Sequence, residues 1–157
     1  NLVGFQTNLK YGEQKRVLNL IPGLENASFV KYGVMHRNTY IQSPNLLNNI
    51  YQLKNNKKIF FAGQITGVEG YVESISSGFL AGLNIANEIL GKESIIMPKE
   101  TVIGALADYI STPNEKFQPM NANFGILPQL PEKIKDKKER YKRLADKSLN
   151  CLKDITI

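Results

Sequence analysis

The chain has 157 residues, of which 42% are hydrophobic and 22% are charged. This length and composition suit one ordinary globular domain and exclude a wholly disordered chain. The apolar runs are far shorter than the roughly 20 residues that a bilayer-spanning helix needs, so we expect no membrane partner. One cysteine excludes an internal disulfide and favours the reducing cytoplasm, and one histidine excludes a histidine-rich metal site.

The net charge of +6 lies mostly near the C-terminal end of the chain. Residues 132–157 hold seven Lys and two Arg against five acidic residues, which leaves +4 there and +2 in residues 1–131. A basic total alone is weak evidence for a nucleic-acid partner. The chain begins with Asn rather than Met and has no charged and apolar leader, so we expect no signal peptide and a piece of a longer protein.

The first part of the chain alternates short predicted elements with polar turns. Alternating apolar residues indicate the strands, and apolar residues at helical spacing indicate the helices. Proline and glycine mark where these elements end. The elements are a strand over Asn1–Thr7, a helix over Lys10–Ile21, a strand over Ala27–Met35, a short helix over Leu46–Tyr51 that Ser43-Pro44-Asn45 caps, and a surface loop over Lys54–Lys58.

The most organised block of the sequence follows. Lys58–Ala62 is a short apolar run that predicts a buried parallel strand, and it leads into the glycine-rich segment Gly63–Gly70. Tyr71–Leu90 lacks proline and predicts a long helix that Gly91 terminates. A strand, a glycine-rich turn and a long helix make one half of a nucleotide-binding crossover unit.

The segment Gly63–Gly70 reads GQITGVEG, with its glycines spaced G-x-x-x-G-x-x-G. Glycines permit positive φ and the close approach of a ligand, and the helix after them directs free N–H groups at the turn. A phosphate or the electron-rich edge of a flavin suits such a place. The spacing differs from the G-x-G-x-x-G fingerprint of a pyrophosphate turn, and a plain tight turn is the alternative.

Small residues form a stripe along the long helix, which predicts close packing against a sheet. They are Ser74, Gly78, Gly82 and Ala86, at intervals of four residues.

The last part of the chain predicts two helices joined by an extended segment. Thr101–Ile110 reads as a short helix, and the prolines of Ser111–Pro131 favour extended chain. Glu132–Leu152 predicts a charged amphipathic helix, whose basic residues form either a solvated face or a surface for RNA phosphates. Its expected apolar face consists of Ile134, Tyr141, Ala145, Leu149 and Leu152.

Polar and planar side chains follow the predicted strand 27–35, at His36, Arg37 and Asn38. A capped polar turn explains them, and so does a planar ligand that stacks on the imidazole and the guanidinium. Cys151 has no base nearby in the sequence, and we interpret it as a helix-face residue rather than a nucleophile.

Four motifs, in order along the chain, carry a family resemblance: GFQTNLKYGEQKRV at 4–17, YGVMHRNTYI at 32–41, GQITGVEGYVES at 63–74 and FQPMNANFGILP at 117–128. With them the chain resembles the C-terminal part of the bacterial folate- and FAD-dependent tRNA (uracil-5-)-methyltransferases, the TrmFO family. This family is related to the GidA/MnmG flavoproteins that modify wobble uridine.

The resemblance implies an α/β fold: the C-terminal portion of a Rossmann-type FAD-binding fold, the end of an inserted α+β domain, and a C-terminal helical segment. The inserted domain would end in residues 1–44, and residues 45–157 would belong to the FAD-binding domain and its C-terminal helices. The implied activity is methylation of C5 of a T-loop uridine in tRNA. Methylenetetrahydrofolate would donate the carbon, and FAD reduced by NAD(P)H would supply reducing equivalents.

The resemblance also implies the residues of the site. The expected cofactor contacts are Gly63, Gln64, Gly67, Val68, Glu69, Gly70 and Tyr71. Gln64 would offer its amide to a ribityl hydroxyl or to the pyrimidine edge. His36 is the candidate for stacking on the folate pterin, with Arg37 and Asn38 near its polar edge.

Two departures and two rival interpretations accompany the resemblance. The family's G-x-G-x-x-G turn and nucleophilic cysteines have no counterpart here, and Cys151 matches neither cysteine, so we expect the chain alone to be inactive and not to retain FAD. One rival is a non-catalytic RNA-binding domain that uses the basic C-terminal helix. The other is a wobble-uridine flavoprotein, which shares the GQ-x-x-G turn, although VEGYVES and HRNTYI favour the folate enzyme.

Overall fold

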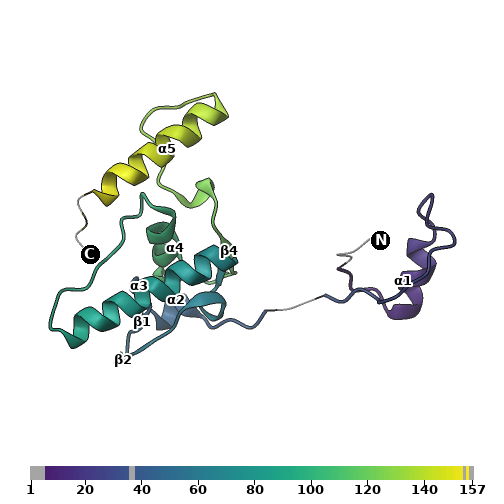
Figure 1. The fold of residues 1–157 in the computed structure, drawn as a ribbon, viewed down its shortest axis with the longest axis horizontal. Coiled ribbons are helices and arrows are strands. Elements are labelled where there is room, and N and C mark those ends of the chain that lie inside the picture. The colour runs from purple at the N-terminus through teal and green to yellow at the C-terminus, as the bar shows by residue number, and fades with distance from the viewer. Residues whose placement is uncertain (1–5, 36–37, 154, 156–157) are drawn as a thin grey trace. The chain divides into compact units, whose positions relative to one another are not determined.

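A computed structural model describes residues 6–35, 38–153 and 155 of the chain. The chain divides into two compact units, residues 1–38 and residues 39–157 (Figure 1). The sequence-based assignment of an inserted domain that ends at residue 44 stays a prediction about the longer protein. The first unit contains α1 (Tyr11–Leu18), and the second contains α2 (Ser43–Leu46), β1 (Gln52–Leu53), β2 (Asn56–Phe60), the 3-10 helix η1 (Gly63–Thr66), β3 (Val68–Glu69), α3 (Tyr71–Ile89), α4 (Val102–Ser111), β4 (Met120–Asn121), the 3-10 helix η2 (Phe124–Ile126) and α5 (Lys137–Leu152).

In the first unit, α1 lies inside the predicted helix 10–21 but ends at Leu18. The predicted strand 27–35 is wrong, because these residues form no strand. The buried side chain of Gln14 accounts for this: its amide donates to the carbonyl of Gly33 (2.8 Å) and accepts from the N–H of Gly33 (2.9 Å). The backbone N–H and carbonyl of Gly33 are therefore already bonded and not available to a partner strand. The predicted strand 1–7 falls mainly on residues 1–5, outside the described residues.

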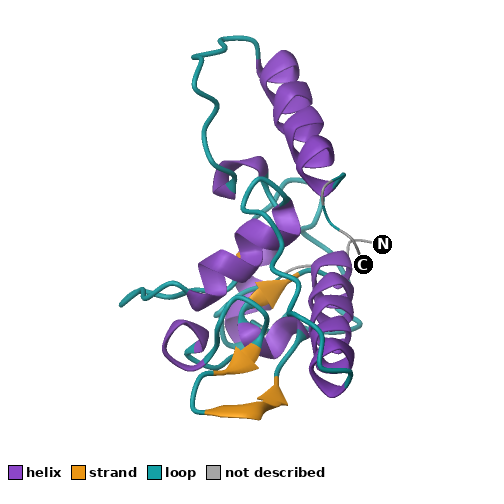
Figure 2. Ribbon diagram, turned by 90° about the vertical axis from the view of Figure 1, so that its left-hand side faces the viewer, coloured by secondary structure: helices purple, strands orange, loops and turns teal. Residues whose placement is uncertain are grey.

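The core of the second unit gathers around α3 and α4, which contact each other, and α2 contacts α4. Two short strand pairs complete the unit: β1 pairs antiparallel with β2, and β3 pairs parallel with β4 (Figure 2). The buried apolar residues of this core are Leu47, Tyr51, Val68, Leu80, Ala81, Leu106, Ala107, Ile110 and Phe117.

The expected buried parallel strand over 58–62 is wrong in its position, its burial and the direction of its pairing. β2 covers Asn56–Phe60, pairs antiparallel with β1 and leaves Asn56–Ile59 exposed. The predicted loop 54–58 is instead the tip and second strand of this hairpin. A hairpin needs only a two-residue connection, whereas a parallel pair needs a long crossover, so the local pairing prevails here.

The predicted helix over 46–51 is also wrong, since α2 covers Ser43–Leu46 and the chain then turns. The side-chain oxygen of Asn48 accepts from the N–H groups of Ile50 (3.2 Å) and Gln52 (3.0 Å). Tyr51 has φ of 67°, in the left-handed region, which a right-handed helix cannot contain. A polar side chain that bonds the nearby backbone has replaced the helix with a turn.

The predicted long helix is confirmed by α3, Tyr71–Ile89. Gly91 ends it with φ of 66°, and the N–H of Lys92 donates to the carbonyl of Asn87 (2.8 Å), as in a Schellman motif. The small-residue stripe does not pack as predicted. A Cβ at Gly78 or Gly82 would meet nothing within 4 Å, and the buried positions of the helix are Ser77, Leu80, Ala81 and Asn84.

Asn84 links α3 to the segment that follows it, and its replacement by alanine should lower stability. Its amide nitrogen donates to the carbonyl of Ile95 (3.0 Å), its oxygen accepts from the N–H of Ile95 (2.7 Å), and the side chain is fully buried. Asn84→Ala leaves both groups of Ile95 unpaired, at a cost of about 1–3 kcal/mol. We expect a lower unfolding temperature of the full-length protein. Asn87→Ala removes one exposed bond, to the carbonyl of Glu93, and should change that temperature little; equal losses would contradict the role of Asn84.

The predicted helix over 101–110 is confirmed by α4, which Thr101 caps by accepting from the N–H of Gly104 (2.9 Å). Segment 111–131 is largely irregular, apart from β4 and η2.

The predicted helix over 132–152 begins only at Lys137, because Asp136 caps it by accepting from the N–H of Glu139 (2.7 Å). The pattern Asp-x-x-Glu is that of a capping box and marks this start in the sequence. The expected apolar face is wrong in part: Leu144 is the buried residue of α5, packed with Ala105 and Leu127, whereas Leu149 is 62% exposed.

Candidate cofactor-binding turn

The candidate site is the turn that runs from η1 through β3 into α3. Gly63, Gly67 and Gly70 have φ of 75°, 87° and 96°, in a region where a residue with a Cβ is strained. The N–H of Gly63 donates to the hydroxyl of Ser77 (2.7 Å), and that hydroxyl donates to the carbonyl of Ser74 (2.7 Å). The start of the turn is therefore tied directly to α3.

A second group of hydrogen bonds fixes the turn from within the core. The hydroxyl of Thr66 donates to the carbonyl of Gly63 (2.7 Å), and the hydroxyl of Ser43 donates to the carbonyl of Thr66 (2.7 Å). Both Ser43 and Thr66 are fully buried. A buried polar network with its groups satisfied holds a single arrangement, so the turn has a defined shape before any ligand binds.

Gly67 is required by its neighbour Phe117. A Cβ at Gly67 would lie 2.9 Å from Cε1 of the Phe117 ring and closer still to Cζ. Phe117 is itself buried, with the ring of Tyr109 tilted against it at 5.5 Å between centroids. The carbonyl of Gly67 accepts from the N–H of Met120 (2.8 Å), next to the β3–β4 pairing. Packing therefore explains this glycine without a ligand.

The first turn of α3 has no side-chain cap, because the residue at its N-cap is Gly70. The first N–H groups of an α-helix have no carbonyl four residues earlier in the helix to bond. Those of Tyr71, Val72 and Glu73 therefore remain donors for an external acceptor. The carboxylate of Glu73 lies near Gly70, and one of its oxygens accepts from the N–H of Ala122 (3.1 Å). This negative charge partly offsets the helix dipole at the turn.

The structure places the expected cofactor contacts on one continuous stretch of chain, but in different environments. The side chains of Gln64 and Tyr71 are exposed, Tyr71 by 91%. Glu69 is half-buried, and the side chain of Val68 is fully buried in the core. Val68 can therefore face a ligand only with its backbone.

The expected folate contacts lie at the end of the first unit. His36 and Arg37 are outside the described residues, and Asn38 is exposed. The sequence assigned no role in this site to the residues that shape the turn, Ser43, Ser77, Glu73 and Phe117. Phe117 opens one of the four motifs, which marks it, but no spacing rule indicates which serine hydroxyl bonds which backbone group.

A cavity of about 200 Å³ lies beside the first turns of α3, between this helix and α4. Burial raises the pKa of the Tyr51 phenol well above its usual value, so this lining group stays neutral at physiological pH. Polar and apolar residues line this cavity: Tyr51, Val72, Glu73, Ser76, Ser77, Val102, Ile103, Leu106 and Ala122.

Residues 6–35, 38–153 and 155 contain no group of three or more His, Cys, Asp or Glu placed to hold a metal ion. Within the same described stretch, no helix has the length and apolar character needed to span a bilayer.

The comparison with protein families shows to which family the chain belongs. The family model described as Glucose inhibited division protein A matches residues 1–93, more than half of the sequence. The chain belongs to this family. Among solved structures, the GidA of Aquifex aeolicus in its form II crystal matches with a TM-score of 0.63 and 24% identity, over 94% of this chain and 23% of that chain. A shared mixed α/β fold over part of GidA follows from this match.

Curated relatives of this GidA-family chain are more similar still, and the resemblance inferred from the four motifs is confirmed. The methylenetetrahydrofolate–tRNA-(uracil-5-)-methyltransferase TrmFO of Bacillus subtilis is 60% identical over 157 residues. The proteins of the same name from Halalkalibacterium halodurans and Staphylococcus aureus are also 60% identical. Each match covers 99% of this chain but 36% of the relative, so the chain spans about a third of the length of these relatives.

Proposed function

We propose that this GidA-family chain is part of a flavoenzyme that methylates C5 of a T-loop uridine in tRNA. The observation that carries the proposal is the 60% identity to TrmFO methyltransferases along nearly the whole chain. The carbon donor is methylenetetrahydrofolate, the cofactor is FAD reduced by NAD(P)H, and the enzyme works in the cytoplasm. The chain alone is inactive and does not retain FAD, since it corresponds to about a third of those relatives.

The turn 63–71 fits one edge of FAD in its chemistry. Uncapped N–H groups at the start of α3 suit an electron-rich ring edge or a phosphate oxygen, and the exposed amide of Gln64 suits a ribityl hydroxyl. When bound, FAD would provide the reducing equivalents and the carrier of the one-carbon unit. Gln64 would hold it through its amide, and residues 67–71 mainly through their backbone.

The proposal assigns residues 45–157 to the C-terminal part of a Rossmann-type FAD-binding domain and residues 1–44 to the end of an inserted domain. His36 stacks on the folate pterin in this proposal, and Arg37 and Asn38 bond its polar edge. A planar pterin suits an imidazole and a guanidinium, which offer flat faces for stacking.

One face of α3 supports the proposal that the chain works within a larger protein. Val72, Ile75 and Phe79 are 74%, 72% and 62% exposed, and Ile89 is 79% exposed at the other end of the helix. Several large exposed apolar side chains on one helix, such as Val72, Ile75 and Phe79, are typical of an interface rather than a solvated face. The remaining length of the TrmFO relatives offers the chain that would cover it.

The test uses the full-length protein that contains this chain. It is incubated with unmodified tRNA, NADPH or NADH, and methylenetetrahydrofolate labelled with ¹⁴C in its methylene carbon. We expect label in the tRNA that depends on both the folate and the reductant. Label-free tRNA, together with tight tRNA binding, would favour the rival proposal of a non-catalytic RNA-binding protein.

Gln64 should contribute to FAD affinity without being indispensable. In the full-length protein, Gln64→Ala removes one hydrogen bond, worth roughly 0.5–1.5 kcal/mol, so FAD should dissociate up to about tenfold more readily. Gln129→Ala is the matched control, because Gln129 is an exposed glutamine outside the turn. Flavin absorbance during titration of each apoprotein with FAD measures the FAD dissociation constants of Gln64→Ala and Gln129→Ala. Equal constants for the two variants would remove Gln64 from the site.

A further inference from the structure

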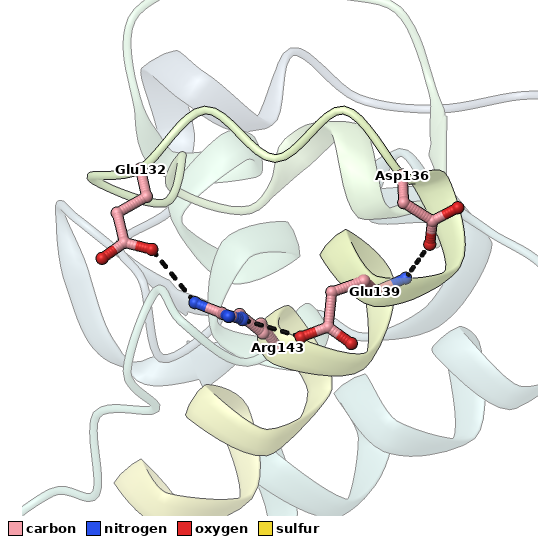
Figure 3. A network of polar contacts seen from close by, with 4 residues as sticks. All are labelled: Glu132, Asp136, Glu139 and Arg143. Atoms are coloured by element: carbon pink, nitrogen blue, oxygen red, sulfur yellow. Dashed lines mark hydrogen bonds and ion pairs between the residues drawn. The ribbon is translucent and has the colours of Figure 1, made fainter.

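Basic residues cluster at the start of α5 and just before it. Arg143 differs from its neighbours, because it donates to Glu139 (2.9 Å) and to Glu132 (3.0 Å), as Figure 3 shows. Asp136 is engaged as the N-cap of the helix. Three of the acidic side chains in this region are therefore committed to one arginine or to the backbone.

The other cations of this segment remain exposed, and the ion pairs found among the described residues include none of them. We call them the α5 basic patch: Lys133, Lys135, Lys137, Lys138, Arg140 and Lys142. Arg143 pairs with Glu132 and Glu139, so these carboxylates form no ion pair with the patch cations, which outnumber the nearby acidic residues and leave the surface net positive.

An aromatic pair orders part of the patch. The rings of Phe124 and Tyr141 stack with centroids 4.4 Å apart and planes 13° apart. Lys137 Nζ and the Arg140 guanidinium each lie 5.5 Å from the centre of the Tyr141 ring. Cation–π contacts of this kind restrict two long side chains before a partner arrives, so less entropy is lost when an anion binds.

We propose that the α5 basic patch binds the phosphate backbone of tRNA. The proposal rests on the proposed function, which makes tRNA the substrate, and it assigns a place on this chain to that contact. Several exposed cations close together in the chain suit the closely spaced phosphates of an RNA strand, which they bind by releasing counterions. The solvated-face interpretation of this helix is the alternative.

The test measures the affinity of the full-length protein for unmodified tRNA at several salt concentrations. Each phosphate contact contributes about 0.7–0.9 to the slope of log K against log salt. Lys137→Gln with Lys138→Gln should therefore reduce the slope by about one to two and weaken binding at low salt. Lys57→Gln with Lys58→Gln is the matched control, because it removes the same charge from exposed lysines of β2.

A variant that is expected to strengthen tRNA binding distinguishes an effect on binding from a folding defect. Glu132→Gln leaves Arg143 paired with Glu139 but removes a negative charge beside the patch, so tRNA binding should tighten at low salt. Glu115→Gln is its exposed control.

A salt slope that is unchanged in the Lys137→Gln, Lys138→Gln variant, or reduced equally in the Lys57→Gln, Lys58→Gln control, overturns the proposal. If folate-dependent methylation persists in that case, only this inference fails. If tRNA binds through the patch but is not methylated, the proposed function fails instead.

Discussion

Replacing Gly67 with alanine is expected to destabilise the full-length protein by about 2–5 kcal/mol. Two costs add: a non-glycine residue at φ of 87° is strained by about 1–2 kcal/mol, and crowding in a packed core costs about 1–3 kcal/mol. The crowding arises because the new Cβ would collide with the ring of Phe117, a rigid and buried side chain. Thermal or denaturant unfolding measures the loss.

Gly78→Ala is the matched control for this prediction. Gly78 lies within α3, and a Cβ there would meet nothing within 4 Å. Alanine is favoured over glycine in a helix by about 1 kcal/mol, so this variant should be as stable as the original protein or more so. Adding Phe117→Leu to Gly67→Ala should recover the crowding part of the loss but not the strain. A Gly67→Ala protein with unchanged stability would contradict the packing described for the turn.

Replacing His36 with alanine is expected to abolish folate-dependent methylation while FAD remains bound. The reason lies in the proposed role: without the imidazole, the pterin loses its stacking partner, whereas the cofactor turn at residues 63–71 is unchanged. The measurement compares flavin absorbance and label transfer to tRNA in the full-length variant.

A second substitution at His36 distinguishes stacking from proton transfer. Phenylalanine keeps a flat ring but cannot exchange a proton, so His36→Phe should retain part of the activity if the residue stacks. A fully active His36→Ala enzyme would eliminate the role in either form. If His36→Ala and His36→Phe lose activity equally, the role of His36 is proton transfer rather than stacking.

The sequence predicted best those elements whose ends are marked locally. The helix α3 lies between Gly70 and Gly91 without an internal proline, and α4 begins at the N-cap Thr101. These signals act over a few residues, so they can be read without knowing the rest of the fold. The capping box at Asp136 is a signal of the same kind, and it corrects the start of α5.

The errors arose where the pairing partner of a segment, distant or nearby, decides its structure. Residues 27–35 alternate like a strand, but the side chain of Gln14 takes the backbone groups of Gly33. Residues 58–62 are apolar like a buried strand, but the hairpin with β1 determines their pairing. At the candidate site, the glycine spacing located the turn, whereas the contact of Gly67 with Phe117 joins positions fifty residues apart along the chain and no spacing rule predicts it.

The identity of the modified nucleoside tests the proposed function most directly. After incubation of the full-length protein with unmodified tRNA, methylenetetrahydrofolate and NAD(P)H, the tRNA is digested to fragments and its nucleosides are separated by mass. We predict 5-methyluridine in the T-loop fragment, carrying the methylene carbon of the folate. Modification at the wobble uridine instead, or an unmodified T-loop in the presence of a flavin-loaded protein, would contradict the proposal.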